Sequence, residues 1–435
     1  MEVVWSRPGE ELGQADTTVI GCYQKPFGPE PPHSGKETDG SEQLINTILD
    51  EGWFKGDTGE TGSVTFPGEG RIILVGLGKR GELNSAALRT AVTAAVKEAQ
   101  HIKAKRVRFQ LLGHSSPLDE LASARLIPEI ALLSSYQFDK YKSEKKPGSI
   151  EQVQVDLGEK PSAKLQAAVQ EGGVLGQATC AARDLVNEPA NILTPEELAQ
   201  RAKTIGNQSG CEVAILDETD IKALNMQAYL EVARAAANPP RLIVMRYNGS
   251  KRADADTIAL VGKGLTYDTG GLSIKNNEGM VTMRRDMGGA AAVIGAMSAI
   301  AQQKLEVKAV GVIAACENMV SERAYRPGDV IGSMAGKTIY VANTDAEGRL
   351  TLIDAINYAI EKEGAAKIAD LATLTGAATH TLGYAADVVV SNSDELYAAL
   401  EQAAEASGEK KWRMPIFDEY KQQLKSDMAD LTNAP

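Results

Sequence analysis

The sequence predicts a two-domain α/β protein whose second domain is built on a mostly parallel sheet. Three observations predict this fold class. The chain has 435 residues, which is too long for one ordinary hydrophobic core. Its hydrophobic content of 43% and charged content of 24% are typical of a globular protein. Short apolar strand patterns alternate with helical patterns along the chain, as they do in α/β layer domains.

Residues 1–158 are predicted to form the first domain. Residues 84–102 carry apolar side chains at helical spacing, and Asn84 is a good N-cap for that helix. The segment YKSEKKPGS, residues 141–149, is polar and contains Pro and Gly, so the domain boundary is placed just after it. Strand patterns occupy residues 17–23, 71–78, 106–113 and 150–157.

Residues 159–435 are predicted to form the second domain. A long helical pattern covers residues 162–186, and a second helix starts after Thr194. Thr194 is its predicted N-cap, with Pro195 at the first helical position and Glu197 closing a capping box. Near-continuous apolar strands then alternate with helices, which indicates a buried, mostly parallel sheet. These strand patterns lie at residues 211–217, 241–247, 257–264, 307–315, 338–342, 366–374 and 387–392.

Composition argues against several classes of partner. A net charge of −12 disfavours nonspecific binding to nucleic acid or to anionic membranes. The N-terminus lacks the basic start and apolar run of a signal peptide, and no stretch approaches the length of a membrane span. We therefore expect a cytoplasmic protein with no membrane partner. The widely spaced cysteines contain no CxxC pair and are interpreted as reduced thiols: Cys22, Cys180, Cys211 and Cys316.

Two features of the first domain are interpreted as structural. GLGKRG, residues 76–81, matches GxGxxG, but Glu98 lies inside the following helical pattern rather than after a second strand. We interpret it as a tight strand-to-helix turn and reject a dinucleotide cofactor. A basic run is interpreted as a solvated helix end that leads into an edge strand: Lys103, Lys105, Arg106 and Arg108.

The second domain contains a glycine-rich loop after an apolar strand. VGKGLTYDTGG, residues 261–271, carries Lys263 and Asp268, and Lys275 follows shortly after. Loops at the carboxyl ends of parallel strands are where open α/β sheets bind ligands. Further along, Asp286 stands immediately before a glycine pair and a helical pattern; taken alone, it is best interpreted as an N-cap.

VANTDAEGRL, residues 341–350, crowds three charged residues between a strand and a helix: Asp345, Glu347 and Arg349. Thr344 and Glu347 match a capping box, which is the structural explanation of the segment. That explanation leaves Asp345 and Arg349 without a role.

Four acidic residues follow apparent strands or precede helices, so they are expected to converge on one edge of the sheet: Asp268, Asp286, Asp345 and Glu347. Four carboxylates in a poorly solvated site repel one another strongly, and two divalent cations at ~3.5–4 Å would balance them. The scattered histidines and the lack of an HExxH motif argue against a histidine-rich zinc site. Oxygen ligands leave Mg²⁺, Mn²⁺, Co²⁺ and Zn²⁺ all possible.

Three basic residues, Lys263, Lys275 and Arg349, then need roles beside the predicted cations. A Lys ligates a metal only when neutral, and neighbouring dications favour that form. A second, charged Lys could stabilise an oxyanion, and Arg349 could hold a carboxylate or small oxyanion in a bidentate fork. A water between two metals would supply the nucleophile, since no protein general base accompanies the set.

Three segments resemble, in order and spacing, the signatures of the cytosolic leucyl aminopeptidase family: GKGLTYDTGG (262–271), MRRDMGGAA (283–291) and NTDAEGRL (343–350). Other similar segments, such as DLVNEPANILTPEELA and ADLATLTGAA, extend the resemblance over nearly the whole chain. The resemblance implies an N-terminal macro-like α/β domain and a C-terminal α/β/α catalytic domain. It also implies a homohexamer that removes N-terminal, preferably leucine-like, residues from peptides through a hydroxide that bridges two metals.

The resemblance assigns a role to each matching residue. The implied metal ligands are Lys263, Asp268, Asp286, Asp345 and Glu347, of which Asp268 and Glu347 would be shared. Two divalent ions are expected, Zn²⁺ or Mn²⁺, with Mg²⁺ or Co²⁺ possible. Lys275 and Arg349 match the catalytic pair, and a bicarbonate ion on Arg349 would act as general base. The implied substrate contacts are Met283, Asn343, Thr373 and Leu374.

The sequence departs from the family pattern in two places. Tyr267 stands where Phe is usual, and family members continue for several dozen residues beyond the position of Pro435. The catalytic domain is therefore interpreted as truncated at its C-terminus, which leaves part of the pocket wall in doubt.

Two alternative functions stay open at this point. One is a DNA-binding accessory protein on the same scaffold, which the acidic balance disfavours. The other is a two-metal phosphatase, which does not explain the remaining matched segments.

Overall fold

The fold is described from a computed structural model of residues 1–5, 15–29, 47–48, 50–66, 70–144, 150–158 and 160–435. The chain divides into two compact units, Met1–Cys180 and Ala181–Pro435. Residues 145–149 of the predicted linker lie outside the described residues. In the described part of the chain, no helix is long and apolar enough to cross a membrane.

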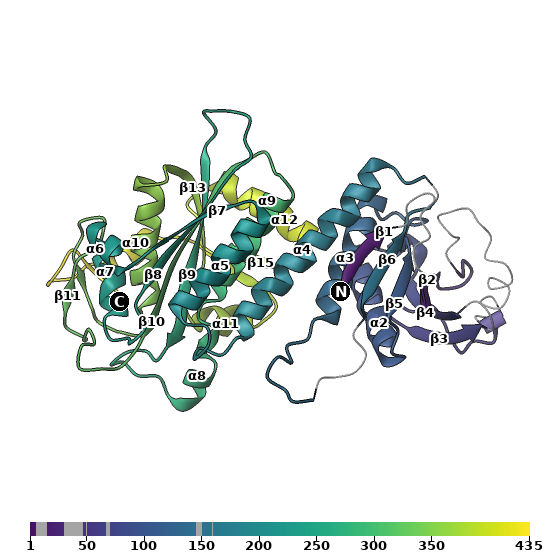
Figure 1. The fold of residues 1–435 in the computed structure, drawn as a ribbon, viewed down its shortest axis with the longest axis horizontal. Coiled ribbons are helices and arrows are strands. Elements are labelled where there is room, and N and C mark those ends of the chain that lie inside the picture. The colour runs from purple at the N-terminus through teal and green to yellow at the C-terminus, as the bar shows by residue number, and fades with distance from the viewer. Residues whose placement is uncertain (6–14, 30–46, 49, 67–69, 145–149, 159) are drawn as a thin grey trace. The chain divides into compact units, whose positions relative to one another are not determined.

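The first unit is an α/β layer. Its described sheet has six strands in the order β1-β6-β5-β2-β4-β3, and only the β3–β4 pair is antiparallel. The helices α2 and α3 pack on this sheet over one continuous apolar core (Figure 1). The elements are β1 (Glu2–Trp5), β2 (Thr17–Tyr23), β3 (Thr61–Phe66), β4 (Gly70–Gly78), η1 (Arg80–Glu82), α2 (Ser85–His101), β5 (Arg106–Gln110), α3 (Glu120–Ser135) and β6 (Gln152–Asp156).

In this unit the sequence predicted α2 correctly but assigned β5 to the wrong place in the sheet. Asn84 caps α2 as expected, because its side chain accepts hydrogen bonds from the backbone N–H groups of Ala86 and Ala87. The strand after the basic run, β5, is internal rather than an edge strand, since it pairs with both β2 and β6. Its alternate side chains Val107 and Phe109 are fully buried, as an internal position requires.

The second unit is built on a five-stranded sheet in the order β13-β9-β10-β8-β7. Four of these strands run in one direction and β8 alone runs against them, which confirms a mostly parallel sheet. The helix α4 (Ala163–Asn187) precedes the unit and its C-terminal end belongs to it. The strands and helices up to the middle of the unit are α5 (Pro195–Ser209), β7 (Glu212–Leu216), α6 (Glu218–Ala223), α7 (Gln227–Ala233), β8 (Arg241–Asn248), β9 (Thr257–Asp268), α8 (Asn277–Val281), η2 (Met283–Arg285) and α9 (Gly288–Gln302).

The remaining elements complete this unit and add two small sheets. The sheet β11-β12-β16 is mixed, whereas β14 and β15 form a parallel pair. The bounds are β10 (Lys308–Asn318), β11 (Val330–Ile331), β12 (Ile339–Tyr340), α10 (Gly348–Glu361), β13 (Ala365–Leu371), α11 (Ala377–Leu382), β14 (Asp387–Val389), α12 (Asp394–Ser407), β15 (Lys411–Arg413), α13 (Asp418–Gln423) and β16 (Leu431–Thr432).

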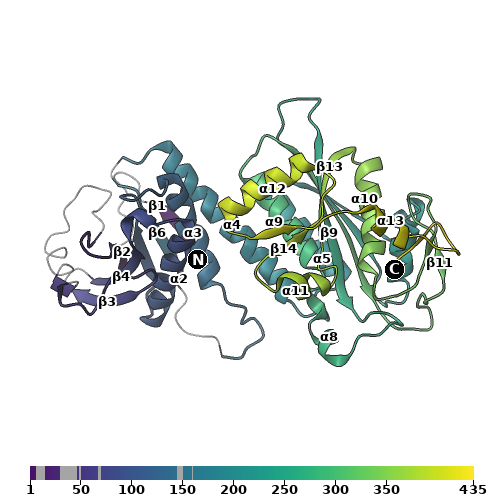
Figure 2. The ribbon, with the colours of Figure 1, turned by 180° about the vertical axis from the view of Figure 1, so that it is seen from behind.

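Helices cover both faces of the five-stranded sheet and create an apolar core on each side. On one face α6, α7 and α10 pack against the strands, and on the other face α5 and α9 do so. Figure 1 shows α5 and α9 on one side of the strands and α7 and α10 on the other, and Figure 2 shows the same layers from behind. The arrangement is the α/β/α sandwich predicted for the second domain.

The start of α5 follows the sequence prediction only in part. Thr194 caps the helix, since its hydroxyl accepts a hydrogen bond from the backbone N–H of Glu197 at 3.3 Å. The reciprocal half of the capping box is missing, because the Thr194 N–H donates to Ile192 O instead. The Glu197 carboxylate accepts from Arg201 Nε at 2.7 Å, one helical turn later. The ion pair therefore competes successfully with the capping contact.

A buried carboxylate on α10 ties this helix to α7 and to the loop after β11. Asp354 is fully buried and accepts hydrogen bonds from the backbone N–H groups of Tyr229 at 3.0 Å and Met334 at 2.8 Å. Burial raises the pKa of Asp354 from 3.8 to about 6, and the backbone N–H groups of Met334, Tyr229 and Ala228 only partly oppose that rise.

Asp354 is expected to stabilise the fold more at acidic pH than at neutral pH. Because its folded pKa is above its unfolded value, the folded state binds the proton more tightly, and the contribution is lost as pH rises from 3.8 through about 6. The free energy of unfolding of wild type minus that of Asp354→Ala should rise by up to about 3 kcal/mol between pH 7 and pH 4. Urea unfolding of both proteins across this range measures it; a difference that stays constant with pH would contradict the assignment.

Candidate metal centre and active site

The acidic residues predicted from the sequence are brought to one edge of the five-stranded sheet by three segments. Asp268 is the last residue of β9, and Asp286 follows η2 just before α9 begins. Glu347 directly precedes α10. Single oxygens of these three carboxylates lie within 4.8 Å of one another, and all three residues are buried. Such a separation is compatible with shared coordination of divalent cations.

Close backbone approach at two glycines makes this convergence possible. A Cβ on Gly289, in the first turn of α9, would lie 1.9 Å from Leu371 O and 3.0 Å from Lys263 N. A Cβ on Gly348 would lie 2.5 Å from Lys263 Cε. Only glycine fits at position 289, where a Cβ would collide with backbone, so α9 can begin directly against β9 and β13. At Gly348 an added Cβ would require the Lys263 side chain to shift.

Two lysines lie between the carboxylates. Lys263 Nζ is 2.8 Å from Asp286 Oδ2 and 2.7 Å from Glu347 Oε1. Lys275 Nζ is 2.9 Å from Asp268 Oδ2 and also pairs with Asp345. Four carboxylates thus face two ammonium groups, and the cluster retains an excess of acidic groups.

The electrostatics of the cluster favour additional positive charge. Burial raises the pKa of Glu347 to about 7 and that of Asp286 to about 6, and the Asp268 carboxylate adds to both rises, although Lys263 opposes them. Glu347 Oε2 is buried without a hydrogen-bond donor among the described residues. A buried acceptor in an electronegative cluster fits a cation, which would lower both pKa values.

The pKa values of the two lysines are raised as well, although burial acts on them in the opposite direction. Burial lowers the pKa of Lys263, but the carboxylates of Glu347 and Asp286 outweigh burial and leave the pKa raised. Burial likewise lowers the pKa of Lys275, and its bonds to Asp345 and Asp268 more than reverse that effect. Both side chains are therefore ammonium groups while these carboxylates are their charged partners.

The capping roles considered for these acidic residues are wrong. Among the described residues no side chain caps α9, and Asp286 Oδ1 instead accepts from Thr373 Oγ1 at 2.8 Å. No side-chain hydrogen bond caps α10 either. The Thr344 hydroxyl donates to Gly270 O at 2.7 Å and accepts from Ser273 N at 2.8 Å, so it joins two loops rather than completing a capping box.

Arg349 lies in the first turn of α10, two residues after Glu347. Within the described residues it forms no ion pair or side-chain hydrogen bond, and its Nε is buried without a partner. A half-buried guanidinium that has no carboxylate partner fits an anion.

The four residues expected to contact substrate are not equally close to the carboxylates. Thr373 touches the cluster, since it bonds Asp286 and its carbonyl accepts from Lys263 Nζ at 3.3 Å. Met283 lies in η2 and its carbonyl accepts from Asp286 N at 3.3 Å. Asn343 Oδ1 accepts from Asp345 N at 2.8 Å, and Leu374 is 40% exposed beside Thr373.

Sequence reasoning missed the neutral side chains that hold these loops. Asn318 donates to Asp268 and to Thr344 O, and Tyr325 Oη also donates to Thr344 O at 2.7 Å. Asn433 accepts from the N–H groups of Ala342 and Asn343, and its Nδ2 donates to Asn343 O at 2.6 Å. An isolated Asn or Tyr carries no sequence signal for such a role, because its partners lie 19 to 91 residues away.

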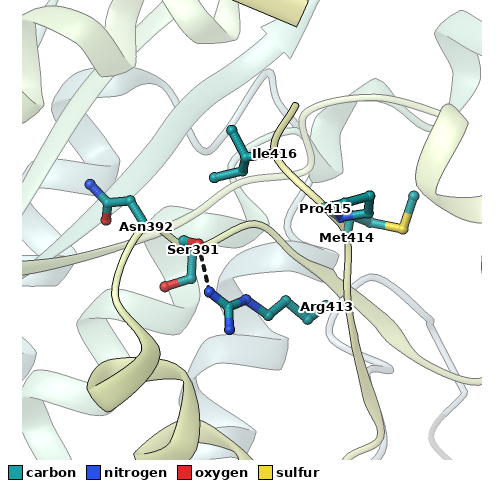
Figure 3. Close-up of a pocket in the computed structure, with 6 residues that line it drawn as sticks. All are labelled: Ser391, Asn392, Arg413, Met414, Pro415 and Ile416. Atoms are coloured by element: carbon teal, nitrogen blue, oxygen red, sulfur yellow. Dashed lines mark hydrogen bonds between the residues drawn. The ribbon is translucent and has the colours of Figure 1, made fainter. Parts of the chain in front are cut away.

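Two other features do not belong to this centre. A pocket at β14 and β15 is lined by Ser391, Asn392, Arg413, Met414, Pro415 and Ile416 (Figure 3), none of which was predicted as a site residue. Its Arg413 is occupied, because it donates to Ser391 O at 3.0 Å and pairs with Asp394 at 2.7 Å. In the basic run of the first unit, Lys105 pairs with Glu151 at 3.1 Å and Arg108 Nε donates to Gln154, so part of its charge is neutralised locally.

Comparison with known proteins identifies relatives over both units. The catalytic-domain model of the cytosol aminopeptidase family matches residues 180–435, and its N-terminal-domain model matches residues 19–145. A probable cytosol aminopeptidase of Clostridium perfringens is 48% identical over 399 residues, covering 89% of this chain and 80% of that protein. A probable cytosol aminopeptidase of Alkaliphilus oremlandii is 43% identical over 427 residues, covering 96% of this chain and 85% of that protein.

Solved structures agree with this relationship. A mutant of tomato leucine aminopeptidase superposes with a TM-score of 0.85 at 35% identity, covering 100% of this chain and 86% of that chain. The bottromycin maturation enzyme BotP in complex with Mn superposes with a TM-score of 0.82 at 31% identity, covering 97% of this chain and 86% of that chain. With a two-unit α/β fold and a buried acidic cluster, the chain belongs to the cytosol aminopeptidase family of metal-dependent peptidases.

Proposed function

We propose that this enzyme is a two-metal leucyl aminopeptidase, and the convergence of Asp268, Asp286 and Glu347 carries the proposal. These residues offer oxygen donors within 4.8 Å of one another, and Asp345 is linked to them through Lys275. Hard oxygen donors with at most one amine suit Zn²⁺ or Mn²⁺, with Mg²⁺ or Co²⁺ as further candidates. Asp268 and Glu347 are proposed as the shared ligands.

Lys263 is proposed as the fifth ligand. It sits between Asp286 and Glu347, where it is an ammonium group in the described arrangement. To coordinate a cation it must lose its proton, which nearby divalent charge favours.

The remaining residues are proposed to act on the substrate. Bound divalent ions supply an activated water and polarise the scissile carbonyl. Lys275, when a cation takes over its carboxylate partners, is free to donate to the developing oxyanion. Arg349 has no carboxylate partner among the described residues and is proposed to hold a bicarbonate ion that moves the proton.

The preference for leucine-like residues, the cytoplasmic location and the homohexamer are parts of the same proposal. Met283 and Thr373 would contact the N-terminal side chain of the peptide, and Asn343 and the backbone of Leu374 would orient its main chain. The domain boundary is proposed at residue 158, because α4 starts at Ala163 and a boundary before it leaves the helix whole.

Chelation is expected to abolish activity and to destabilise the second unit. Without cations, Lys263 and Lys275 are the basic partners that these carboxylates have among the described residues. A metal present at 100 times its Kd stabilises the fold by about 2.7 kcal/mol. Hydrolysis of leucine-p-nitroanilide and the melting temperature should therefore both fall with EDTA and return on addition of Zn²⁺ or Mn²⁺. Activity that survives exhaustive chelation, with metal analysis showing none bound, would refute the proposal.

A further inference from the structure

One buried amide links two of the segments that carry the acidic cluster. Asn318 is the last residue of β10 and is fully buried. Its Nδ2 donates to Asp268 Oδ1 at 2.8 Å and to Thr344 O at 3.1 Å. Asp268 ends β9, whereas Thr344 lies in the loop that leads to Glu347. A single side chain therefore fixes the distance between the end of a strand and the loop before α10.

The orientation of this amide is determined by its partners. Both partners are acceptors, so the NH₂ group must face them and the carbonyl must face away. Asn318 Oδ1 is then buried without a donor among the described residues, an arrangement that costs free energy. The two donated bonds offset that cost, and the one to a carboxylate belongs to the stronger, charge-assisted class.

The amide also fixes which oxygen of Asp268 faces the cluster. Asp268 Oδ1 accepts from Asn318 Nδ2 and from the backbone N–H of Gly270 at 2.9 Å. Asp268 Oδ2 is left to the cluster, where Lys275 Nζ lies 2.9 Å away. Without Asn318, the Gly270 N–H would be left to hold Oδ1 by itself, and the carboxylate could rotate. Hydrogen bonds that orient a ligating carboxylate are a main determinant of metal affinity.

We infer that Asn318 is a positioning residue for the metal centre: it orients Asp268 and holds it at a fixed separation from the loop that carries Glu347. The inference rests on the proposed metal site but concerns a residue outside the ligand set. Asn318 acts on the cations only through Asp268 and the loop, so its loss should weaken metal binding more than it weakens the fold.

The test compares Mn²⁺ binding by the full chain of wild type and Asn318→Leu, using titration calorimetry on metal-free protein. Leu has the same branched shape and the same number of side-chain heavy atoms but donates no hydrogen bond. We expect Mn²⁺ affinity to fall about 10–100-fold. The melting temperature of the metal-free protein should change little, and saturating Mn²⁺ should restore most of kcat. The control is Asn238→Ala, which removes a 2.9 Å bond to Glu317 beside Asn318 and should bind Mn²⁺ like wild type.

A second comparison separates Asp268 from the loop. Tyr325→Phe removes the other donor to Thr344 O and leaves Asp268 untouched. A smaller loss of affinity in Tyr325→Phe than in Asn318→Leu supports the inference, and an equal loss in both overturns it. Affinity of Asn318→Leu within twofold of wild type also overturns it.

Two further outcomes concern whether the Asn318 variants fold and whether the wild-type protein binds metal at all. If Asn318→Leu does not fold, Asn318→Ala is measured in its place. Failure of both to fold, with Asn238→Ala folded, would assign Asn318 to the fold and overturn the inference. A wild type that binds no Mn²⁺ or Zn²⁺ would overturn the proposed function together with the inference, whereas the other outcomes leave that function standing.

Discussion

Glu347→Gln is expected to lose both bound metal and aminopeptidase activity while remaining folded. The substitution keeps the volume but replaces a carboxylate whose Oε2 has no hydrogen-bond donor among the described residues and whose Oε1 faces Lys263. Loss of a ligand should reduce metal affinity and kcat/KM by more than the roughly 10–100-fold typical of residues that only orient a ligand. Glu347→Ala should have the same effect or a larger one.

Metal analysis, the rate of leucine-p-nitroanilide hydrolysis and circular dichroism together measure this outcome. The matched control is Glu361→Gln, the same substitution at the other end of α10, where the exposed carboxylate accepts a hydrogen bond from Asn357. It should behave as wild type. A Glu347→Gln protein that cleaves the substrate at the wild-type rate would show that this carboxylate is not a ligand.

Gly289→Ala is expected to have the largest effect on stability of any single methyl group added near the site. Its Cβ would lie 1.9 Å from Leu371 O and 3.0 Å from Lys263 N, and neither backbone atom can move without separating β13 or β9 from α9. Overpacking of this kind costs about 1–3 kcal/mol and occasionally more, and a clash with backbone belongs at the upper end. Because Asp286 precedes α9, metal affinity should fall as well.

The neighbouring glycine supplies the control. A Cβ on Gly288 would lie 3.4 Å from Thr373 Cγ2, which is an ordinary van der Waals contact. Ala is a better helix former than Gly, so Gly288→Ala should be neutral or stabilise the fold by up to about 1 kcal/mol. Urea unfolding of both metal-free variants measures the difference; equal free energies of unfolding would contradict the close approach at Gly289.

Local patterns were sufficient for the α/β class and for the segments of the acidic cluster. The helix that follows Glu347 lies where the apolar spacing placed it, whereas the strand predicted at residues 257–264 extends four residues further and ends at Asp268. The capping interactions that local sequence patterns predicted at this site are not formed. Thr344 with Glu347 matches a capping box, but in the folded chain Thr344 bonds Gly270 and Ser273, which are more than 70 residues away. A local pattern states what a residue can bond, whereas packing decides which partner it reaches.

Pairing within the sheets was also beyond the sequence pattern. The apolar pattern of β8 resembles that of its neighbours, yet it runs antiparallel to both β10 and β7. The pattern of β5 likewise did not show that two strands would flank it. Strand direction and order depend on connections and on long-range pairing, neither of which changes the alternation of side chains along one strand.

The sequence by itself therefore determined the family, the α/β architecture and the acidic and basic residues expected to do the chemistry, because these depend on residue type and local spacing. Only the tertiary structure decided how those residues are held. It placed Lys263 between Asp286 and Glu347, and it brought Asn318 against Asp268. Such contacts join residues 23 to 84 positions apart in pairs that no short pattern encodes, since they form only when separate strands and helices pack at one edge of the sheet.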